Sequence, residues 1–261
     1  MIGIGIDIGS TAAKAAVVDG DGSVAWTCVQ PTGFSSVDAS ERLREALAAA
    51  GYDVTGDDVR VVATGYGRVA VPYAHKVVTE ITCHGAGAVR LFGDHGTVID
   101  VGGQDTKVIQ LKSGRVAKFA MNDKCAAGTG RFYEAMARSF EMTLPEFSNL
   151  SLTAKNVIPI TAQCTVFAES EVITLVGEGK PMDEIAAGIQ MAVAKRCFVM
   201  SKKAGATDAI TLTGGCAKNA GLKQAIEHVL KLKVIDLKTD PQLMGALGAA
   251  EYARQKGMAR V

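Results

Sequence analysis

The sequence lacks three features that would each point to a particular class of protein. Its 28 basic and 27 acidic side chains leave a formal net charge of +1, and no lysine or arginine cluster is long enough to indicate nucleic-acid binding. No apolar run approaches the ~18 residues that a membrane-spanning helix needs. The first residues also lack the basic and long apolar regions of a signal peptide. We therefore expect a soluble, cytoplasmic protein that binds neither nucleic acid nor membrane.

The cysteines also lack a recognisable spacing pattern. Six are present, at Cys28, Cys83, Cys125, Cys164, Cys197 and Cys216. The two nearest in sequence, Cys197 and Cys216, are 19 residues apart, so no C-x-x-C spacing indicates a local zinc or ferredoxin-type site. Spacing alone favours isolated thiols in a reducing compartment, mostly buried as small apolar side chains.

What the sequence does contain is a duplicated strand–turn–strand unit. The first copy has expected strands at 2–6, 13–18 and 23–28, and the second at 97–99, 107–111 and 115–121. In each copy the first strand runs into an aspartate followed by glycine, Asp7-Ile8-Gly9-Ser10-Thr11 and then Asp100-Val101-Gly102-Gly103-Gln104-Asp105. The two aspartates are 93 residues apart. The repeat predicts two related α/β lobes, 1–92 joined by a returning C-terminal helix at 241–261, and 93–240.

Both turns have the chemistry of phosphate binding. Glycine lets backbone N–H groups approach phosphate oxygens closely, and Ser10 and Thr11 add hydroxyl donors. Asp7 and Asp100, facing one another across a cleft, would suit a hydrated Mg²⁺, which prefers one or two carboxylates plus phosphate oxygens and waters. One Asp-x-Gly turn is weak support, but two copies in matching contexts are much stronger.

Two further glycine pairs follow predicted strands. Gly214-Gly215 lies between an expected strand at 209–213 and an expected helix at 217–230, a junction that directs backbone donors at an anion or nucleotide. Gly65-x-Gly67 follows an expected strand at 59–64 and fits a dinucleotide fingerprint. Pro72 interrupts the helix that this fingerprint needs, and 82–87 is small and loop-like, so we interpret Gly65–Gly67 as a turn.

In order along the chain, these motifs resemble the two phosphate motifs and the adenosine motif of the acetate and sugar kinase, Hsp70 and actin superfamily. The matching residues are Asp7-x-Gly9-Ser10-Thr11, Asp100-x-Gly102-Gly103-Gln104-Asp105 and Thr213-Gly214-Gly215. The resemblance implies two ribonuclease-H-like lobes with ATP in the cleft between them.

A narrower resemblance covers essentially the whole chain. It is carried by five runs, 63–68 (ATGYGR), 121–132 (MNDKCAAGTGRF), 164–171 (CTVFAESE), 213–219 (TGGCAKN) and 245–250 (GALGAA). They are similar to stretches of the activators of 2-hydroxyacyl-CoA dehydratases and the ATPase subunits of benzoyl-CoA reductase. Cys216 and Lys218 depart from the adenosine motif of the dehydratase activators.

This resemblance implies an iron–sulfur cluster. Two cysteines per subunit of that family hold one [4Fe–4S] cluster across a two-fold dimer interface, and they correspond to Cys125 and Cys164. A [4Fe–4S] cluster takes four thiolates, and a two-fold axis supplies each residue twice. Each cysteine also precedes an expected helix, with apolar stripes at Phe132, Met136 and Phe140 and at Val166, Ile173 and Val176, which we interpret as core packing.

The resemblance also implies an activity: ATP-gated transfer of an electron from a ferredoxin or flavodoxin to a CoA-ester dehydratase or reductase. Asp7 and Asp100 would position Mg²⁺, Lys14 would reach a phosphate, and Gln104 or Asp105 would orient the attacking water. The residues expected to frame the nucleoside are Gly128, Thr129, Gly130, Gly214, Gly215, Asn219 and Gln242. Lys14 and Gln242 fit a solvated surface position equally well.

Two other functions remain open on the sequence. A small-molecule kinase of the same superfamily would use the phosphate motifs without a metal cluster, and a nucleotide-switched scaffold would need no catalysis. The dimer partner is either a second copy or a similar ATPase subunit.

Overall fold

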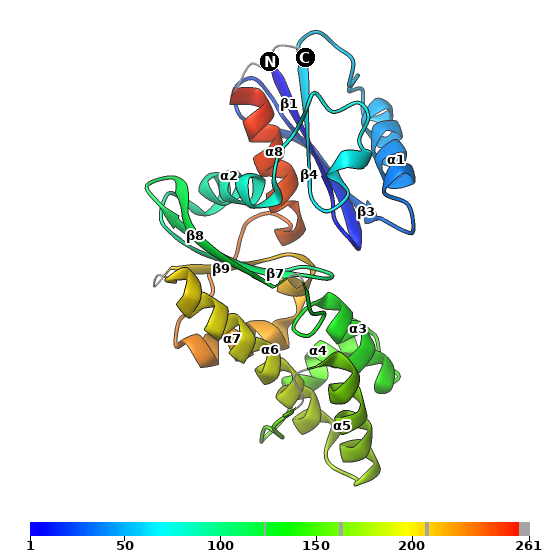
Figure 1. Ribbon diagram of the computed structural model, residues 1–261, viewed down its shortest axis with the longest axis vertical. Helices are drawn as coiled ribbons and strands as arrows, with labels where there is room; N and C mark the ends of the chain where they lie inside the picture. The colour runs from blue at the N-terminus through cyan, green and yellow to red at the C-terminus, as the bar shows by residue number, and fades with distance from the viewer. Residues whose placement is uncertain (123, 162–163, 207–208, 256–261) are drawn as a thin grey trace. The chain divides into compact units, whose positions relative to one another are not determined.

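The computed structural model describes residues 1–122, 124–161, 164–206 and 209–255 (Figure 1). The chain divides into two compact units. Lobe I comprises Met1–His95, Leu111–Val116 and the chain from Leu237 onward, and lobe II comprises Gly96–Gln110 and Ala117–Asp236. The expected helix at 241–261 forms as a short 3₁₀ turn, η3 (Pro241–Leu243), and helix α8 (Met244–Gln255), and 256–261 lie outside the described residues.

The two lobes contain sheets of the same design. Lobe I has the strand order β3-β2-β1-β4-β5, with strands β1 (Ile2–Ile8), β2 (Ala12–Val18), β3 (Val24–Pro31), β4 (Val59–Thr64) and β5 (Lys76–Val77). Lobe II has the order β8-β7-β6-β9, with strands β6 (Gly96–Val101), β7 (Thr106–Lys112), β8 (Arg115–Asn122) and β9 (Ile210–Thr213). In both, the first strand of the meander also pairs in parallel with a later strand, β4 or β9. The predicted duplication is confirmed, and it extends to a fourth strand.

The alternation of isoleucine and glycine in β1 decides how the sheet of lobe I is covered. Ile4, Ile6 and Ile8 point into a core shared with helix α1 (Ser36–Ala49). The glycines between them face α8, and a Cβ on Gly5 would lie 1.9 Å from the carbonyl oxygen of Ala246. The backbone of α8 therefore packs directly on the backbone of β1, which only glycine permits.

Helix α2 (Glu80–Phe92) corrects one prediction, because 82–87 was expected to be loop-like and is helical. The Thr79 hydroxyl caps the helix by accepting a hydrogen bond from the Thr82 N–H, and Glu80 lies in the first turn, where a carboxylate is favoured. A Cβ on Gly87 would lie 2.0 Å from the carbonyl oxygen of Met244. The small residues that suggested a loop instead allow α2 to pack closely on α8.

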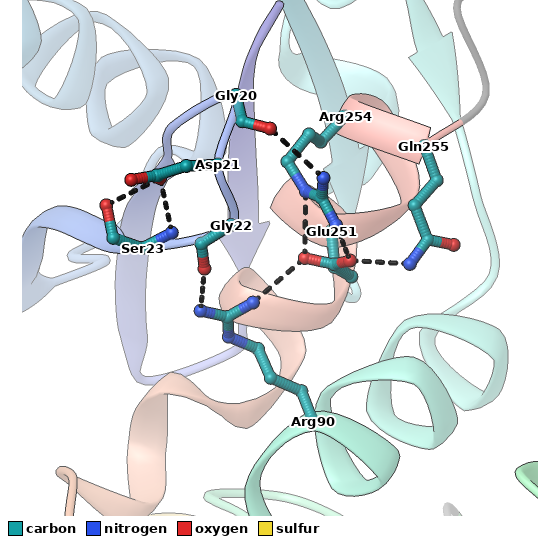
Figure 2. Close-up of polar contacts among 8 residues, drawn as sticks. All are labelled: Gly20, Asp21, Gly22, Ser23, Arg90, Glu251, Arg254 and Gln255. Atoms are coloured by element: carbon teal, nitrogen blue, oxygen red, sulfur yellow. Dashed lines mark hydrogen bonds and ion pairs between the residues drawn. The ribbon is translucent and has the colours of Figure 1, made fainter.

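An ionic network fastens α2, α8 and the β2–β3 turn of lobe I (Figure 2). Arg90 of α2 forms an ion pair with Glu251 of α8 at 2.9 Å and also donates to the carbonyl of Gly22 in the turn. Arg254 and Gln255 donate to the same carboxylate. Burial would raise the pKa of Glu251, but these hydrogen bonds and the charges of Arg254 and Arg90 lower it overall. The ionised carboxylate thus joins three elements of the lobe.

Lobe II is built on a single buried cluster that joins its sheet to its helices. The helices are α3 (Gly130–Ser139), α4 (Leu144–Ser151), α5 (Thr165–Gly177), α6 (Met182–Ala204) and α7 (Ala220–Leu230). The helix expected at 217–230 begins only at Ala220, because Gly215–Lys218 form a 3₁₀ turn, η2, and Asn219 caps α7. Within the described part of the chain, no helix is both long and apolar enough to cross a membrane.

Candidate nucleotide site and cysteine pair

The duplication places an aspartate–lysine pair in each lobe. Asp7, at the end of β1, is 2% exposed, and its Oδ2 lies 3.1 Å from the Nζ of Lys14 on β2. Asp100, at the end of β6, is 3% exposed, and its Oδ2 lies 3.1 Å from the Nζ of Lys107 on β7. Lys14 is therefore not a solvated surface residue. Sequence reasoning missed Lys107, although each lysine follows its aspartate by seven residues.

The two aspartates differ in what their second oxygen contacts. Oδ1 of Asp100 accepts a hydrogen bond of 2.7 Å from the hydroxyl of Thr213. Oδ1 of Asp7 is buried and has no hydrogen-bond partner among the described residues. A buried carboxylate oxygen without a partner calls for a ligand, and an oxygen of this kind is what Mg²⁺ binds. Asp7 thus fits the predicted cation site.

A glycine follows the fourth strand of each sheet in the same conformation. Gly65 (φ +87°) and Gly214 (φ +80°) lie in the left-handed region that favours glycine. A Cβ on Gly65 would lie 2.3 Å from Oδ1 of Asp7, and one on Gly214 would lie 2.4 Å from the carbonyl oxygen of Val101. Gly65–Gly67 is a turn followed by η1 (Arg68–Ala70), as predicted, and it is the lobe I counterpart of Gly214-Gly215.

The loop between β1 and β2 is held by its own backbone and by Thr32. The N–H of Gly9 donates to the carbonyl of Ala12, and the Thr32 hydroxyl donates to the carbonyl of Gly9 at 2.7 Å. A Cβ on Gly9 would lie 2.9 Å from the Nζ of Lys14, so this glycine keeps the ammonium group at the loop. Ser10 is half-buried and Thr11 is exposed.

The two expected catalytic residues lie in the equivalent loop of lobe II, but their side chains differ in exposure and contacts. Gln104 is exposed, whereas Oδ2 of Asp105 lies 2.7 Å from the Nζ of Lys107. The N–H of Gly102 donates to the carbonyl of Asp105, which closes the turn. Asp105 is therefore a charge partner of the buried lysine, and Gln104 is the residue whose side chain is open to solvent.

The residues 128–130 join this loop to the segment that carries Cys125. The N–H groups of Gly130 and Arg131 donate to the carbonyls of Gly102 and Gly103, at 2.8 and 2.9 Å. The Thr106 hydroxyl donates to the carbonyl of Gly128 at 2.7 Å. The Gly102–Asp105 loop and the start of α3 are consequently one hydrogen-bonded unit. Thr129 is fully buried, and its hydroxyl donates to the carbonyl of Ala126.

The remaining residues expected around the nucleoside occupy different places. Gly214 and exposed Gly215 lie at the end of β9, beside Asp100. The side chain of Asn219 caps α7 through the Leu222 N–H and also donates to Gln190. Gln242 is half-buried in η3 and belongs to lobe I.

The cysteines fall into two groups. Cys125 and Cys164 are exposed, whereas Cys83, Cys197 and Cys216 are buried and Cys28 is half-buried. Burial raises the pKa of Cys83, Cys197 and Cys216 to about 12 and also raises that of Cys28. These four therefore remain neutral thiols, as expected for small apolar side chains.

Both exposed cysteines lie in segments fixed by side-chain hydrogen bonds. The amide of Asn122 donates to the carbonyl of Cys125 at 3.0 Å. Cys164 is the residue that caps α5, and Glu171 of that helix accepts bonds from the backbone and hydroxyl of Thr161. Each cysteine thus precedes a helix, as predicted, and α5 directs its positive N-terminal end toward Cys164.

The two exposed cysteines are those that the sequence predicted as cluster ligands. Among the described residues, no group of three or more histidine, cysteine, aspartate or glutamate side chains gathers to hold a metal ion. Burial lowers the pKa of Arg196 on α6, and Cys125 and Cys164 are among the side chains that oppose this effect. Two thiols are half of the four that a [4Fe–4S] cluster takes.

The surface beside Cys164 corrects another prediction. Phe132, Met136 and Phe140 are buried as expected, but the stripe on α5 is not core packing. The large apolar side chains that α5 exposes are Val166 (66%), Phe167 (70%), Ile173 (58%) and Val176 (38%). The opposite face of α5, with Ala168 and Val172, supplies the core contact instead.

Comparison with known proteins identifies relatives over nearly the full length. The chain is 44% identical to the activator of lactoyl-CoA dehydratase from Anaerotignum propionicum over 256 residues, 97% of either chain. Component A of (R)-2-hydroxyglutaryl-CoA dehydratase from Acidaminococcus fermentans superposes with a TM-score of 0.91, at 36% identity and 98% coverage of both chains. The activator of 2-hydroxyisocaproyl-CoA dehydratase from Clostridium difficile, solved with bound ADPNP, has a TM-score of 0.89 at 37% identity and covers 99% or more of each chain.

These neighbours share the actin-like α/β fold that the two duplicated sheets form. Residues 4–253 match the family profile as a whole. The chain belongs to the BadF/BadG/BcrA/BcrD ATPase family.

Proposed function

We propose that this protein is an ATP-hydrolysing electron activator of a CoA-ester dehydratase or reductase. The observation that carries the proposal is the hydrogen-bonded unit of lobe II, which joins the Gly102–Asp105 loop to the segment that carries the exposed Cys125. A nucleotide-dependent change at that loop would be transmitted to Cys125 through Gly130, Arg131 and Gly128. The relatives named as dehydratase activators support the same assignment.

Nucleotide binding is assigned to the paired loops. Asp7 supplies a carboxylate oxygen to Mg²⁺, with Asp100 as the second carboxylate, and Lys14 places its ammonium group at the Gly9–Thr11 loop for a phosphate. Exposed Gln104 orients the attacking water, while Asp105 balances the charge of Lys107. Gly128–Gly130, Gly214, Gly215, Asn219 and Gln242 are proposed to surround the nucleoside.

The cluster is assigned to Cys125 and Cys164 of two subunits. When bound, a [4Fe–4S] cluster supplies a one-electron carrier that accepts from a ferredoxin or flavodoxin and donates to the acceptor enzyme. The apolar face of α5, adjacent to Cys164, gives a second copy of the chain a surface to cover. The two-fold axis of such a homodimer brings four thiolates together.

Iron analysis of anaerobically purified protein tests the cluster. We expect about four iron atoms per two chains, because one cluster of four thiolates is shared. Cys125→Ser and Cys164→Ser should each lose the iron and the electron transfer, whereas Cys197→Ser, a buried thiol on α6, should lose neither. A folded wild-type preparation without iron, or retention of iron by both variants, contradicts the cluster assignment and favours the kinase or scaffold alternatives.

Hydrolysis assays test the nucleotide site separately. Asp7→Asn should lower Mg²⁺-dependent ATP hydrolysis by about 100-fold or more, because the ligand charge to the metal is lost. Asp53→Asn is the matched control, because Asp53 is an exposed acid of the same lobe whose carboxylate accepts hydrogen bonds from Thr55. Unchanged hydrolysis in Asp7→Asn refutes this site without bearing on the iron.

A further inference from the structure

We infer that Arg196 is the cationic positioning residue of the cysteine pair, holding the Cys125 segment in place and raising the reduction potential of the cluster that the two cysteines bind. The inference rests on the proposed function, because it concerns the cluster assigned to Cys125 and Cys164. No sequence motif distinguishes this arginine from the other basic residues among the 28.

Arg196 lies where the segment that follows Cys125 meets helix α6. Its side chain is half-buried, and Ala194 and Cys197 on the same helix are fully buried in the core of lobe II. Burial lowers the pKa of the guanidinium, and Cys125 and Cys164 are among the four side chains that oppose this effect.

Two packing contacts fix the stem and head of the side chain. Gly128, three residues after Cys125, has φ +88°, and a Cβ there would lie 3.1 Å from Cδ of Arg196. The guanidinium carbon lies 5.9 Å from the ring centroid of Phe132 on α3, a cation–π distance. The stem of Arg196 thus supports the loop after Cys125, and the ring of Phe132 holds the charged head.

A fixed positive charge near a cluster favours its reduced form. Reduction adds one negative charge, and a half-buried guanidinium stabilises that charge more than a solvated one does. Arginine stays protonated throughout the accessible pH range, so its effect does not depend on its titration. By contrast, Lys195, the neighbouring residue on α6, is exposed and should contribute little.

A redox titration of the anaerobic holoprotein, monitored by electron paramagnetic resonance, tests the inference. Arg196→Met keeps much of the stem and removes the charge. At a fixed potential, it should lower the ratio of reduced to oxidised cluster by about tenfold, equivalent to a midpoint about 59 mV more negative for one electron. Arg196→Lys, which keeps the charge, and Lys195→Met should both remain close to the wild type.

The variants also separate the possible outcomes. An unchanged midpoint in Arg196→Met, or an equal shift in Arg196→Lys, overturns the charge effect. If Arg196→Met binds no iron while Arg196→Lys does, the charge is needed for assembly and the inference stands; loss of iron from both variants contradicts it. A wild-type protein without iron refutes the proposed function instead, because the titration then has no cluster to report on.

Discussion

At the scale of single residues, the aspartate–lysine pairs of the two lobes differ in burial and in their contacts. Asp7 and Asp100 occupy equivalent strand ends and each has a lysine partner at 3.1 Å. In lobe II, however, Lys107 is 1% exposed and contacts a second carboxylate, that of Asp105. The side chain of Lys14 is 13% exposed, and among the described ion pairs it contacts only Asp7. Lys107 is therefore a buried cation with a structural role, whereas Lys14 is partly exposed to solvent.

Replacement of the two lysines should separate these roles. Lys107→Met should destabilise lobe II by about 3–5 kcal/mol, because it leaves buried Asp100 without its compensating charge. Lys14→Met leaves one carboxylate, that of Asp7, without its charge partner, whereas Lys107→Met leaves two. The Lys14 variant should therefore lose less stability but also lose affinity for ATP. Urea unfolding followed by circular dichroism, together with nucleotide titration, measures both effects. Equal losses of stability in the two variants contradict the assignment.

At the level of elements, three hydrogen bonds among the described contacts join residues 102–106 of lobe II to residues 128–131, where α3 begins. One of them uses a side chain, the hydroxyl of Thr106 bonded to the carbonyl of Gly128. The others are backbone bonds from Gly130 and Arg131, so they depend on the position of α3 and not on the identity of a side chain. Thr106 is thus the point at which this connection can be altered by mutation.

Thr106→Val should loosen the connection while keeping the shape of the residue. It leaves a buried carbonyl without its donor, at a cost of about 1–3 kcal/mol. Amide hydrogen exchange at residues 126–131 should become faster, and the protection that ATP gives to these amides should decrease. Thr153→Val, which removes an exposed hydroxyl that donates to the carbonyl of Leu150 elsewhere in lobe II, is the control. Exchange unchanged from the wild type excludes Thr106 as the connection.

The network around Glu251 provides a test of how lobe I is held together. Glu251→Gln removes the charge that Arg90 and Arg254 both contact and should destabilise the lobe by about 1–3 kcal/mol at neutral pH. Because the pKa of Glu251 is lowered in the folded state, the advantage of the wild type is present above its unfolded value of 4.5. It should decline as the pH falls below that value. Thermal unfolding from pH 7 to pH 3 measures the difference, and a constant gap refutes the assignment.

At the scale of the whole molecule, the exposed face of α5 is the surface that a second subunit would cover. Phe167→Asp places a charge on that face and should convert the dimer to a monomer, with loss of iron, because one chain supplies only two of the four thiolates that the proposed cluster takes. Val37→Asp, which changes an exposed valine on α1 of lobe I, should leave the dimer intact. Analytical ultracentrifugation of the anaerobic proteins measures the oligomeric state. If Phe167→Asp remains a dimer that contains iron, the exposed face of α5 is not the dimer interface.

The sequence by itself determined the features that depend on local pattern. The repeated Asp-x-Gly turns predicted two copies of one strand meander, and the runs around Cys125 and Cys164 indicated the family, which the structural neighbours and the full-length relatives bear out. Turns and alternating strands are local, because they depend on residues two to four positions apart. The same locality explains why the helices that follow both cysteines were predicted correctly.

Only the tertiary structure decided which side chains from distant segments meet. It showed that α2 forms where small residues suggested a loop, since those residues allow contact with α8 at the far end of the chain. It also showed that the stripe of α5 is exposed, because hydrophobic periodicity marks a face but not what covers it. Lys107 follows Asp100 by seven residues, as Lys14 follows Asp7, but only the fold shows that it is buried between two carboxylates. Arg196 carries no such signal, because the ring and the loop that it contacts come from distant segments of the sequence.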